Sequence, residues 1–117
     1  MASIIRLRES RRWSDVVIHG GVAYWVEVAA DMTQEAGGQI AQVLAQIDAT
    51  LTQVGSSREH LLQIVIYLAD LADTATLNAL WDGWVPSGHA PVRACLGAAL
   101  GPGCRVEMII TAAAGNL

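Results

Sequence analysis

The sequence predicts an α+β fold in which two helices pack on one face of a mixed β-sheet. Runs rich in β-branched residues occur at both ends of the chain, and two stretches with apolar residues at helical spacing lie between them. A nearly continuous apolar run separates the two helical stretches. The expected order of elements is β-β-α-β-α-β-β. A length of 117 residues is typical of one domain, spanning residues 1–117.

The residue pattern at the beginning of the chain predicts β-strands. Residues 4–8 alternate between apolar and polar side chains, as in a short edge strand. Val16–His19 and Val22–Val28 are two further runs of this kind, separated by Gly20-Gly21. Two such runs joined by a glycine pair indicate a β-hairpin.

A long amphipathic helix is expected next. Asp31-Met32-Thr33 supplies a helix-start signal, and Gly55 can end the helix. The apolar residues between them recur on one helical face: Ile40, Val43, Leu44, Ile47, Leu51 and Val54. This face should pack on the sheet.

The middle of the chain predicts a buried strand and a second helix. Leu61–Leu68 is apolar almost throughout, which suits a central strand covered on both faces. Asp73 or Thr74 can cap the following helix, which Pro86-Ser87-Gly88 ends. Its apolar stripe consists of Leu77, Leu80, Trp81 and Trp84.

Two strands complete the chain. They span residues 92–100 and 104–113, and the Gly101-Pro102-Gly103 turn predicts a hairpin between them. Cys95 and Cys104 then lie on adjacent strands and could face each other, but reduced thiols are the expected state in the cytosol.

The sheet should have a second apolar face. Both helices need one common surface, so the opposite face is left to side chains such as Leu96, Ala98, Val65 and Tyr67. The charged fraction is only 15%, against about 25% in ordinary domains. A bare apolar sheet face is usually an interface, which predicts an oligomer.

The charge pattern argues against several partners. The net charge is −4, and no basic stripe with interleaved aromatic residues is present, so no nucleic-acid partner is expected. The beginning of the chain lacks a signal-peptide h-region, and no apolar run is long enough to span a membrane. We therefore expect a cytoplasmic protein without a membrane partner.

Three residues near the C-terminus could carry chemistry. Arg93 could bind a carboxylate with its guanidinium fork, and Glu107 could act as a general acid or base. Cys95 lies two residues past Arg93, so it should face the same side of the strand and could line a pocket. Each residue also has a purely structural explanation. Arg93 could form a surface ion pair, Glu107 could occupy a solvated position on an edge strand, and Cys95 could be a buried thiol.

Other polar and aromatic residues are less informative. Trp13 is the one tryptophan outside a predicted element, and Asn78 starts the second helix, where caps and surface residues are more common than ligands. The three histidines are far apart and form no metal-ligand spacing with the cysteines. No metal site is expected.

Taken together, these residues resemble the reactive intermediate deaminase family, RidA (also called YjgF), over nearly the whole chain. The segments that carry the resemblance are Arg12–His19, Gln42–Ala49, Ile66–Asp70, Asn78–Trp84, Gly88–Arg93 and Val106–Met108. The Arg-Trp-Ser-Asp-Val-Val and Gly-His-Ala-Pro-Val-Arg segments are similar to the YoaB-like branch of that family. Their order and spacing together are specific, although no single motif decides.

The resemblance implies a homotrimer of chorismate-mutase-like subunits whose sheets face inward, with clefts between neighbours. In such a trimer Arg93 binds the substrate carboxylate, and Glu107 places and activates a water molecule. Cys95 and Trp13 line the pocket, and Asn78 lies near the cleft.

The resemblance also implies a reaction, the hydrolysis of 2-enamine and 2-imine intermediates of amino acids to 2-keto acids and ammonia. The imine carbon is already electrophilic, so this reaction needs no metal, cofactor or covalent nucleophile. Orientation by Arg93 and proton transfer by Glu107 suit it.

One position departs from the family pattern. Glu27 stands where many members have a glycine, which lets the backbone approach the ligand. Its carboxylate could repel a carboxylate substrate, pair with Arg93 or point away. The alternative function is therefore a non-catalytic protein that binds a small carboxylate on the same trimer. A ribonuclease-like role is disfavoured by the acidic charge.

Overall fold

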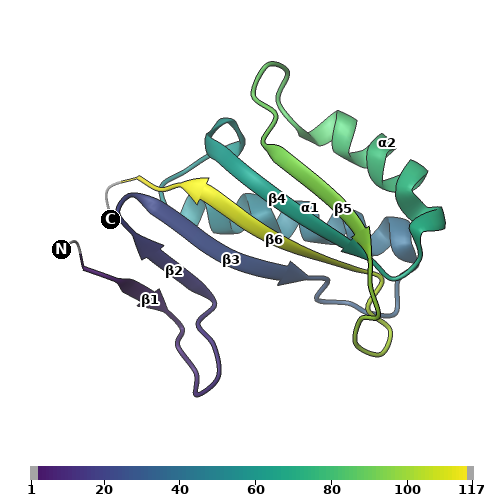
Figure 1. The fold of residues 1–117 in the computed structure, drawn as a ribbon, viewed down its shortest axis with the longest axis horizontal. Coiled ribbons are helices and arrows are strands. Elements are labelled where there is room, and N and C mark those ends of the chain that lie inside the picture. Colours follow the sequence, from purple (N-terminus) through teal and green to yellow (C-terminus); the bar gives the residue numbers. More distant parts are fainter. Residues whose placement is uncertain (1–2, 116–117) are drawn as a thin grey trace.

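The computed structural model describes residues 3–115, which form one six-stranded sheet with two helices (Figure 1). The strands are β1 (Ile5–Leu7), β2 (Val16–His19), β3 (Val22–Val28), β4 (Leu61–Leu68), β5 (Val92–Gly97) and β6 (Val106–Ala113). The helices are α1 (Ala36–Gln53) and α2 (Thr74–Trp84), and the short 3-10 turns are η1 (Arg58–His60) and η2 (Leu71–Asp73). The alternating N-terminal segment forms β1, so three strands precede α1 instead of two.

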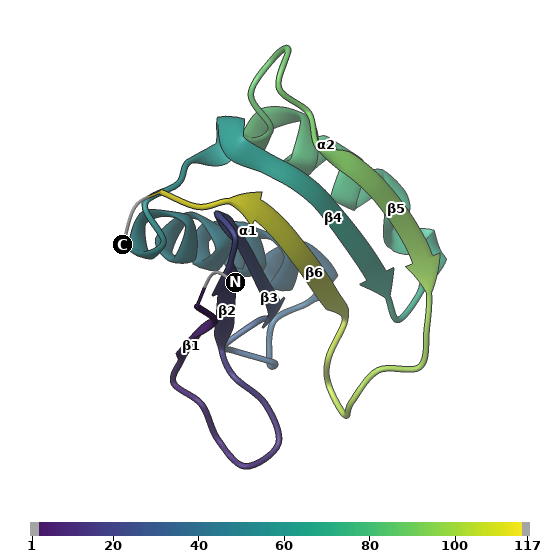
Figure 2. The same ribbon diagram turned by 60° about the vertical axis from the view of Figure 1, so that its left-hand side comes forward.

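The sheet order is β1-β2-β3-β6-β4-β5, and every pairing is antiparallel except the parallel pair β4 and β5. Both helices lie on one face of the curved sheet, and no helix in residues 3–115 covers the other face (Figures 1 and 2). The expected fold class, a mixed sheet with two helices on one face, is confirmed. None of the helices within these residues combines the length and hydropathy needed to cross a bilayer.

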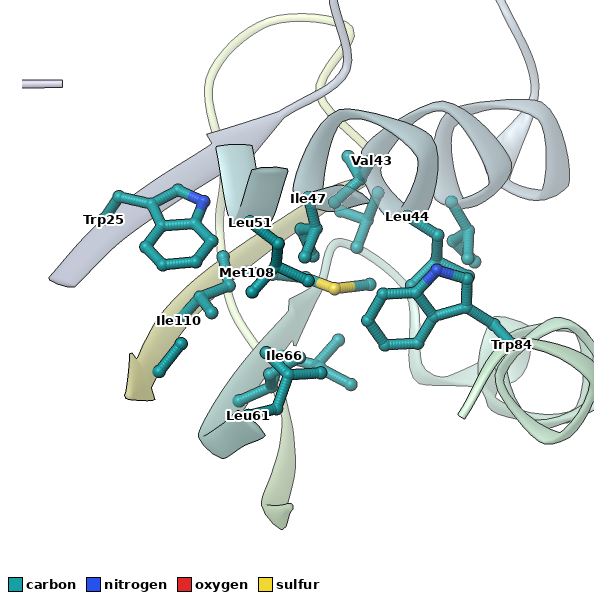
Figure 3. Close-up of a cluster of buried hydrophobic side chains, with 14 of the residues drawn as sticks. Trp25, Val43, Leu44, Ile47, Leu51, Leu61, Ile66, Trp84, Met108 and Ile110 are labelled. Carbon is teal, nitrogen blue, oxygen red and sulfur yellow. The ribbon is translucent and has the colours of Figure 1, made fainter. Parts of the chain in front are cut away.

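The core lies between the helices and the sheet (Figure 3). All six residues of the predicted α1 stripe are buried, together with Leu77, Trp81 and Trp84 of α2. They pack on the inward side chains of β3, β4 and β6, such as Trp25, Ile66 and Met108. Helical periodicity in the sequence therefore identified the covered face correctly.

The opposite sheet face is apolar and open in the protomer. Its exposed side chains include Tyr24, Val26, Val92, Leu96 and Ile109. The register places Val65 beside Ile109, and thus on this same face. The expectation of a second apolar face is confirmed.

The predicted C-terminal hairpin is wrong. β5 and β6 are not neighbours, because β4 lies between them and pairs with both. α2 lies between β4 and β5 in the chain and returns it to the end of the sheet at which β4 begins. This crossover allows β5 to run parallel to β4. Cys95 and Cys104 therefore do not face each other on adjacent strands. Cys104 precedes β6, and burial raises the pKa of its thiol.

Both helices begin differently from the prediction. α1 begins at Ala36, because the Asp31 carboxylate accepts the Thr33 backbone N–H (2.9 Å) and forms a separate turn ahead of the helix. α2 begins at Thr74 as expected, but Asp73 makes no side-chain cap; Asp70 instead accepts from the Ala72 backbone N–H.

A polar cluster joins the two helices on their outer side. The Arg58 Nε and Nη2 atoms each donate to the Asp48 carboxylate at 2.7 Å, and Nη1 donates to the Trp84 carbonyl at 2.9 Å. Hydrogen bonding to Asp48 raises the pKa of Arg58, and its guanidinium lies 5.1 Å from the Trp84 ring centroid. One side chain thus ties η1 to both α1 and α2.

Replacing Arg58 with lysine should lower the free energy of unfolding by about 1 kcal/mol. Lysine keeps the charge but cannot contact both Asp48 oxygens and the Trp84 carbonyl as a planar fork. The Asp48 and Arg58 side chains are 36% and 40% exposed, which limits the effect. Urea denaturation compares this variant with Arg6→Lys, a change at an exposed position on β1. Equal unfolding midpoints for the two variants would contradict the expectation.

Candidate functional site

A cavity of about 620 Å³ opens beside the second half of β3. β2 pairs with β3 only as far as Trp25, so the remaining residues of β3 have no partner on that side. The chain between β1 and β2 borders this free edge. The lining residues are Arg8, Trp13, Ser14, Asp15, Val16, Trp25, Val26, Glu27, Val28, Thr50 and Glu107. Three of the predicted site residues, Trp13, Glu27 and Glu107, therefore line one cavity at the free edge of β3, Glu27 from the helix face and Glu107 from the open face.

Glu107 enters the cavity from β6. The register places it between Val28 of β3 and Tyr67 of β4, on the open face of the sheet. Its side chain is half-buried. Strand alternation puts Met108 on the opposite face, in the core, so the carboxylate stands at the boundary of apolar core and open cavity.

Glu27 is held by α1. The Gln46 Nε2 atom donates to one Glu27 carboxylate oxygen at 3.0 Å, and the Thr50 hydroxyl donates to the other at 3.0 Å. Gln46 is itself anchored, because it donates to the Val28 carbonyl at 2.8 Å and accepts from the Ala30 backbone N–H at 2.9 Å. Of the three possibilities raised above, Glu27 does not pair with Arg93 in the protomer and remains in the cavity wall.

Trp13 lies on the segment between β1 and β2. The Ser10 backbone N–H donates to the Trp13 carbonyl at 2.7 Å, which forms a tight turn. Arg8 pairs with Asp15 at 2.6 Å across the base of this segment. The Trp13 side chain is 65% exposed although it lines the cavity. An indole with this exposure is available to a ligand or a second subunit.

Arg93, Asn78 and Cys95 form a separate group on β5 and α2. The Arg93 Nη2 atom donates to the Asn78 side-chain oxygen at 2.8 Å, and the guanidinium lies 5.2 Å from the Trp81 ring centroid. Asn78 lies inside α2 and not at its start. Cys95 is on the same side of β5 as Arg93 and packs against the core. These contacts orient the guanidinium at the edge of the sheet.

The two groups are apart within one protomer. Arg93 pairs in register with buried Ile64, on the helix side, whereas Glu107 pairs with Tyr67, on the open side. β4 separates β5 from β6, so Arg93 and Glu107 are two strand spacings, about 10 Å, apart across the sheet, and three residues, about 10 Å, apart along β4. A single protomer therefore cannot use Arg93 and Glu107 on one small ligand.

Sequence reasoning missed several residues that support the site. Gln46 and Thr50 lie four residues apart on α1, a spacing that puts both on one helical flank. Two polar residues at this spacing could have indicated a polar contact for this flank of the helix. Only the fold shows that the contact is Glu27. The helical stripe places Trp81 in the core, where it is buried, and its ring also stacks against the Arg93 guanidinium. Residues 3–115 contain no group of three His, Cys, Asp or Glu side chains suited to a metal ion.

Comparison with known proteins identifies the family of this chain. The family model described as endoribonuclease L-PSP matches residues 4–114. The RutC family protein YoaB of Escherichia coli strain K12 is 45% identical over 112 residues, covering 95% of this chain and 98% of the relative.

Solved structures show the same fold. The crystal structure of an uncharacterized protein from Pseudomonas aeruginosa matches with a TM-score of 0.92 at 41% identity, covering 97% of this chain and 100% of that one. A YjgF family member from Neisseria meningitidis matches with a TM-score of 0.92 at 39% identity, covering 99% and 98%. The chain therefore belongs to the RidA/YjgF/RutC family and has its chorismate-mutase-like fold.

Proposed function

We propose that this protein hydrolyses 2-imino and 2-enamino acids to 2-keto acids and ammonia, in clefts between the subunits of a homotrimer. The observation that carries the proposal is the separation of an oriented guanidinium on β5 from a carboxylate in the cavity beside β3. Both groups suit the reaction, and a neighbouring copy could bring them together. The open apolar face, with Val26 and Ile109 exposed, supplies a surface for that copy.

Arg93 would bind the substrate carboxylate. A guanidinium has five N–H donors, and among the described residues only its Nη2 has a hydrogen-bond partner, Asn78. The remaining donors can meet both oxygens of a carboxylate. Asn78 and Trp81 reduce the freedom of the side chain, so less entropy is lost on binding.

Glu107 would move the protons. It accepts a proton from water as the water oxygen attacks the imine carbon, and the C=N bond becomes a C–N bond in a tetrahedral carbinolamine. The same carboxyl group returns this proton to the nitrogen, which gives the neutral carbinolamine. The carboxylate then takes the hydroxyl proton as the carbonyl forms and passes it to the amino group, so the C–N bond breaks and ammonia leaves. An enamine first takes a proton on carbon to become the imine. One water is consumed and one ammonia released for each 2-keto acid.

The test is imine hydrolysis by the purified protein. An amino-acid oxidase generates 2-imino acids, and semicarbazide traps those that remain. We expect Arg93→Ala to lower kcat/KM by about 100-fold or more, because charge-assisted hydrogen bonds to the carboxylate contribute about 1.5–3 kcal/mol each. Arg6→Ala is the matched control, since it removes an exposed guanidinium on β1, away from β5 and β6.

Full activity in Arg93→Ala would exclude the carboxylate-binding role. Absence of hydrolysis in the wild-type protein, across imines with different side chains, would favour the second function, binding of a small carboxylate without turnover. Glu27 is the residue that favours this alternative, because its carboxylate occupies the cavity wall where a glycine would leave space.

A further inference from the structure

The cavity beside β3 has an excess of negative charge. Its lining contains the carboxylates of Asp15, Glu27 and Glu107 and one guanidinium, that of Arg8. Arg8 is already paired with Asp15 at 2.6 Å and also donates to Gln53. Within residues 3–115 neither Glu27 nor Glu107 forms an ion pair. Glu107 is used by the proposed reaction, whereas the charge of Glu27 has no role in it.

Glu27 is fixed in position and still able to accept hydrogen bonds. Gln46 and Thr50 each donate to a different carboxylate oxygen at 3.0 Å. A carboxylate has about four acceptor positions, so two remain. Both donors are neutral and stand on the same helix, α1, which also fixes them relative to the cavity. Such a preorganised, uncompensated carboxylate is suited to a cation.

The rest of the cavity fits a ligand with a long cationic side chain. Trp13 lines the same cavity and is 65% exposed, and an indole face attracts ammonium and guanidinium groups. A volume of about 620 Å³ is within the range of ligand sites and much larger than a three-carbon enamine requires. Space, an aromatic face and a fixed negative charge thus occur together.

We infer that Glu27 selects 2-imino acids with a cationic side chain, such as those formed from basic amino acids. The inference rests on the proposed deaminase function, since it assigns a binding residue to each of three groups of one substrate. Arg93 of a neighbouring subunit binds the carboxylate, Glu107 serves the imine, and Glu27 binds the far cationic group. The same carboxylate repels imines with acidic side chains.

The test measures a ratio of rates. Imines of arginine and of norleucine, a neutral side chain, are generated by the same oxidase, and kcat/KM is measured for each. We expect wild type to prefer the arginine imine, and Glu27→Gln to lower that preference about tenfold, because the amide keeps the shape of the side chain and removes its charge, while the Thr50 hydroxyl can accept from the new NH2 group. Glu59→Gln, an exposed carboxylate on η1, should leave the ratio at the wild-type value. A ratio near one in wild type, or one unchanged in Glu27→Gln, overturns the inference.

A binding measurement separates this inference from the deaminase proposal. Calorimetry compares the keto acids of arginine and norleucine with wild type and Glu27→Gln. Tighter binding of the arginine keto acid that is lost in Glu27→Gln supports the cation subsite, even if wild type hydrolyses no imine and the deaminase proposal fails. Equal binding of both keto acids by wild type overturns the subsite whatever the catalytic result.

Discussion

Mixing Arg93→Ala with Glu107→Ala is expected to restore imine hydrolysis to about one third of the wild-type rate, although each variant alone has lost nearly all of its activity. The two residues lie on opposite faces of the sheet of one protomer, two strand spacings apart across the sheet and three residues apart along β4. In a cyclic trimer, each site would take Arg93 from one subunit and Glu107 from the next. A mixed trimer contains two subunits of one variant and one of the other, so one of its three sites, about one third, carries both residues.

The experiment uses co-expressed chains with two affinity tags, so that only mixed oligomers are assayed against the semicarbazide trap. Each single variant should lose about 100-fold or more of kcat/KM, Arg93→Ala through the carboxylate and Glu107→Ala through proton transfer. The control pairs Arg93→Ala with the double variant, which shares its defect and cannot rebuild a site. Mixed oligomers that stay inactive would exclude a site shared between subunits.

Gln39→Leu is expected to lower the free energy of unfolding by about 2–4 kcal/mol, although it replaces one buried side chain with another of similar size. Gln39 is fully buried, and its Nε2 donates to the carbonyls of Met32 (3.3 Å), Gln34 (3.0 Å) and Gly103 (2.8 Å). Its Oε1 accepts from the Arg105 backbone N–H at 2.9 Å. Leucine fills similar space but leaves these backbone groups without a partner.

Urea denaturation followed by tryptophan fluorescence measures this change. Gln42→Leu is the matched control on the same helix, because Gln42 is only half-buried and its partners lie in the exposed turn at Asp31. It should cost less than about 1 kcal/mol. Equal losses of unfolding free energy in the two variants would show that the buried Gln39 amide stabilises the fold no more than the half-buried Gln42 amide does. Since Arg105 lies two residues before Glu107, Gln39→Leu should also lower activity at temperatures where the protein remains folded.

Much of the fold follows from local patterns. The α1 stripe from Ile40 to Val54, the apolar strand Leu61–Leu68 and the second apolar face were all predicted, because helix and strand periods show in the sequence itself. The family was also identified from the segments around Trp13, Asn78 and Arg93. These features depend on residues within a few positions of each other.

The tertiary structure decided the rest. The Gly101-Pro102-Gly103 turn looked like a hairpin, yet β4 lies between β5 and β6, because strand pairing depends on the crossover through α2 and not on the turn alone. The same order puts Arg93 and Glu107 on opposite faces and brings Gln46 and Thr50 to Glu27. The sequence by itself determined which residues carry chemistry and which faces are apolar, since both are local properties. Which of these residues meet was decided by non-local strand order and register, which no short pattern encodes.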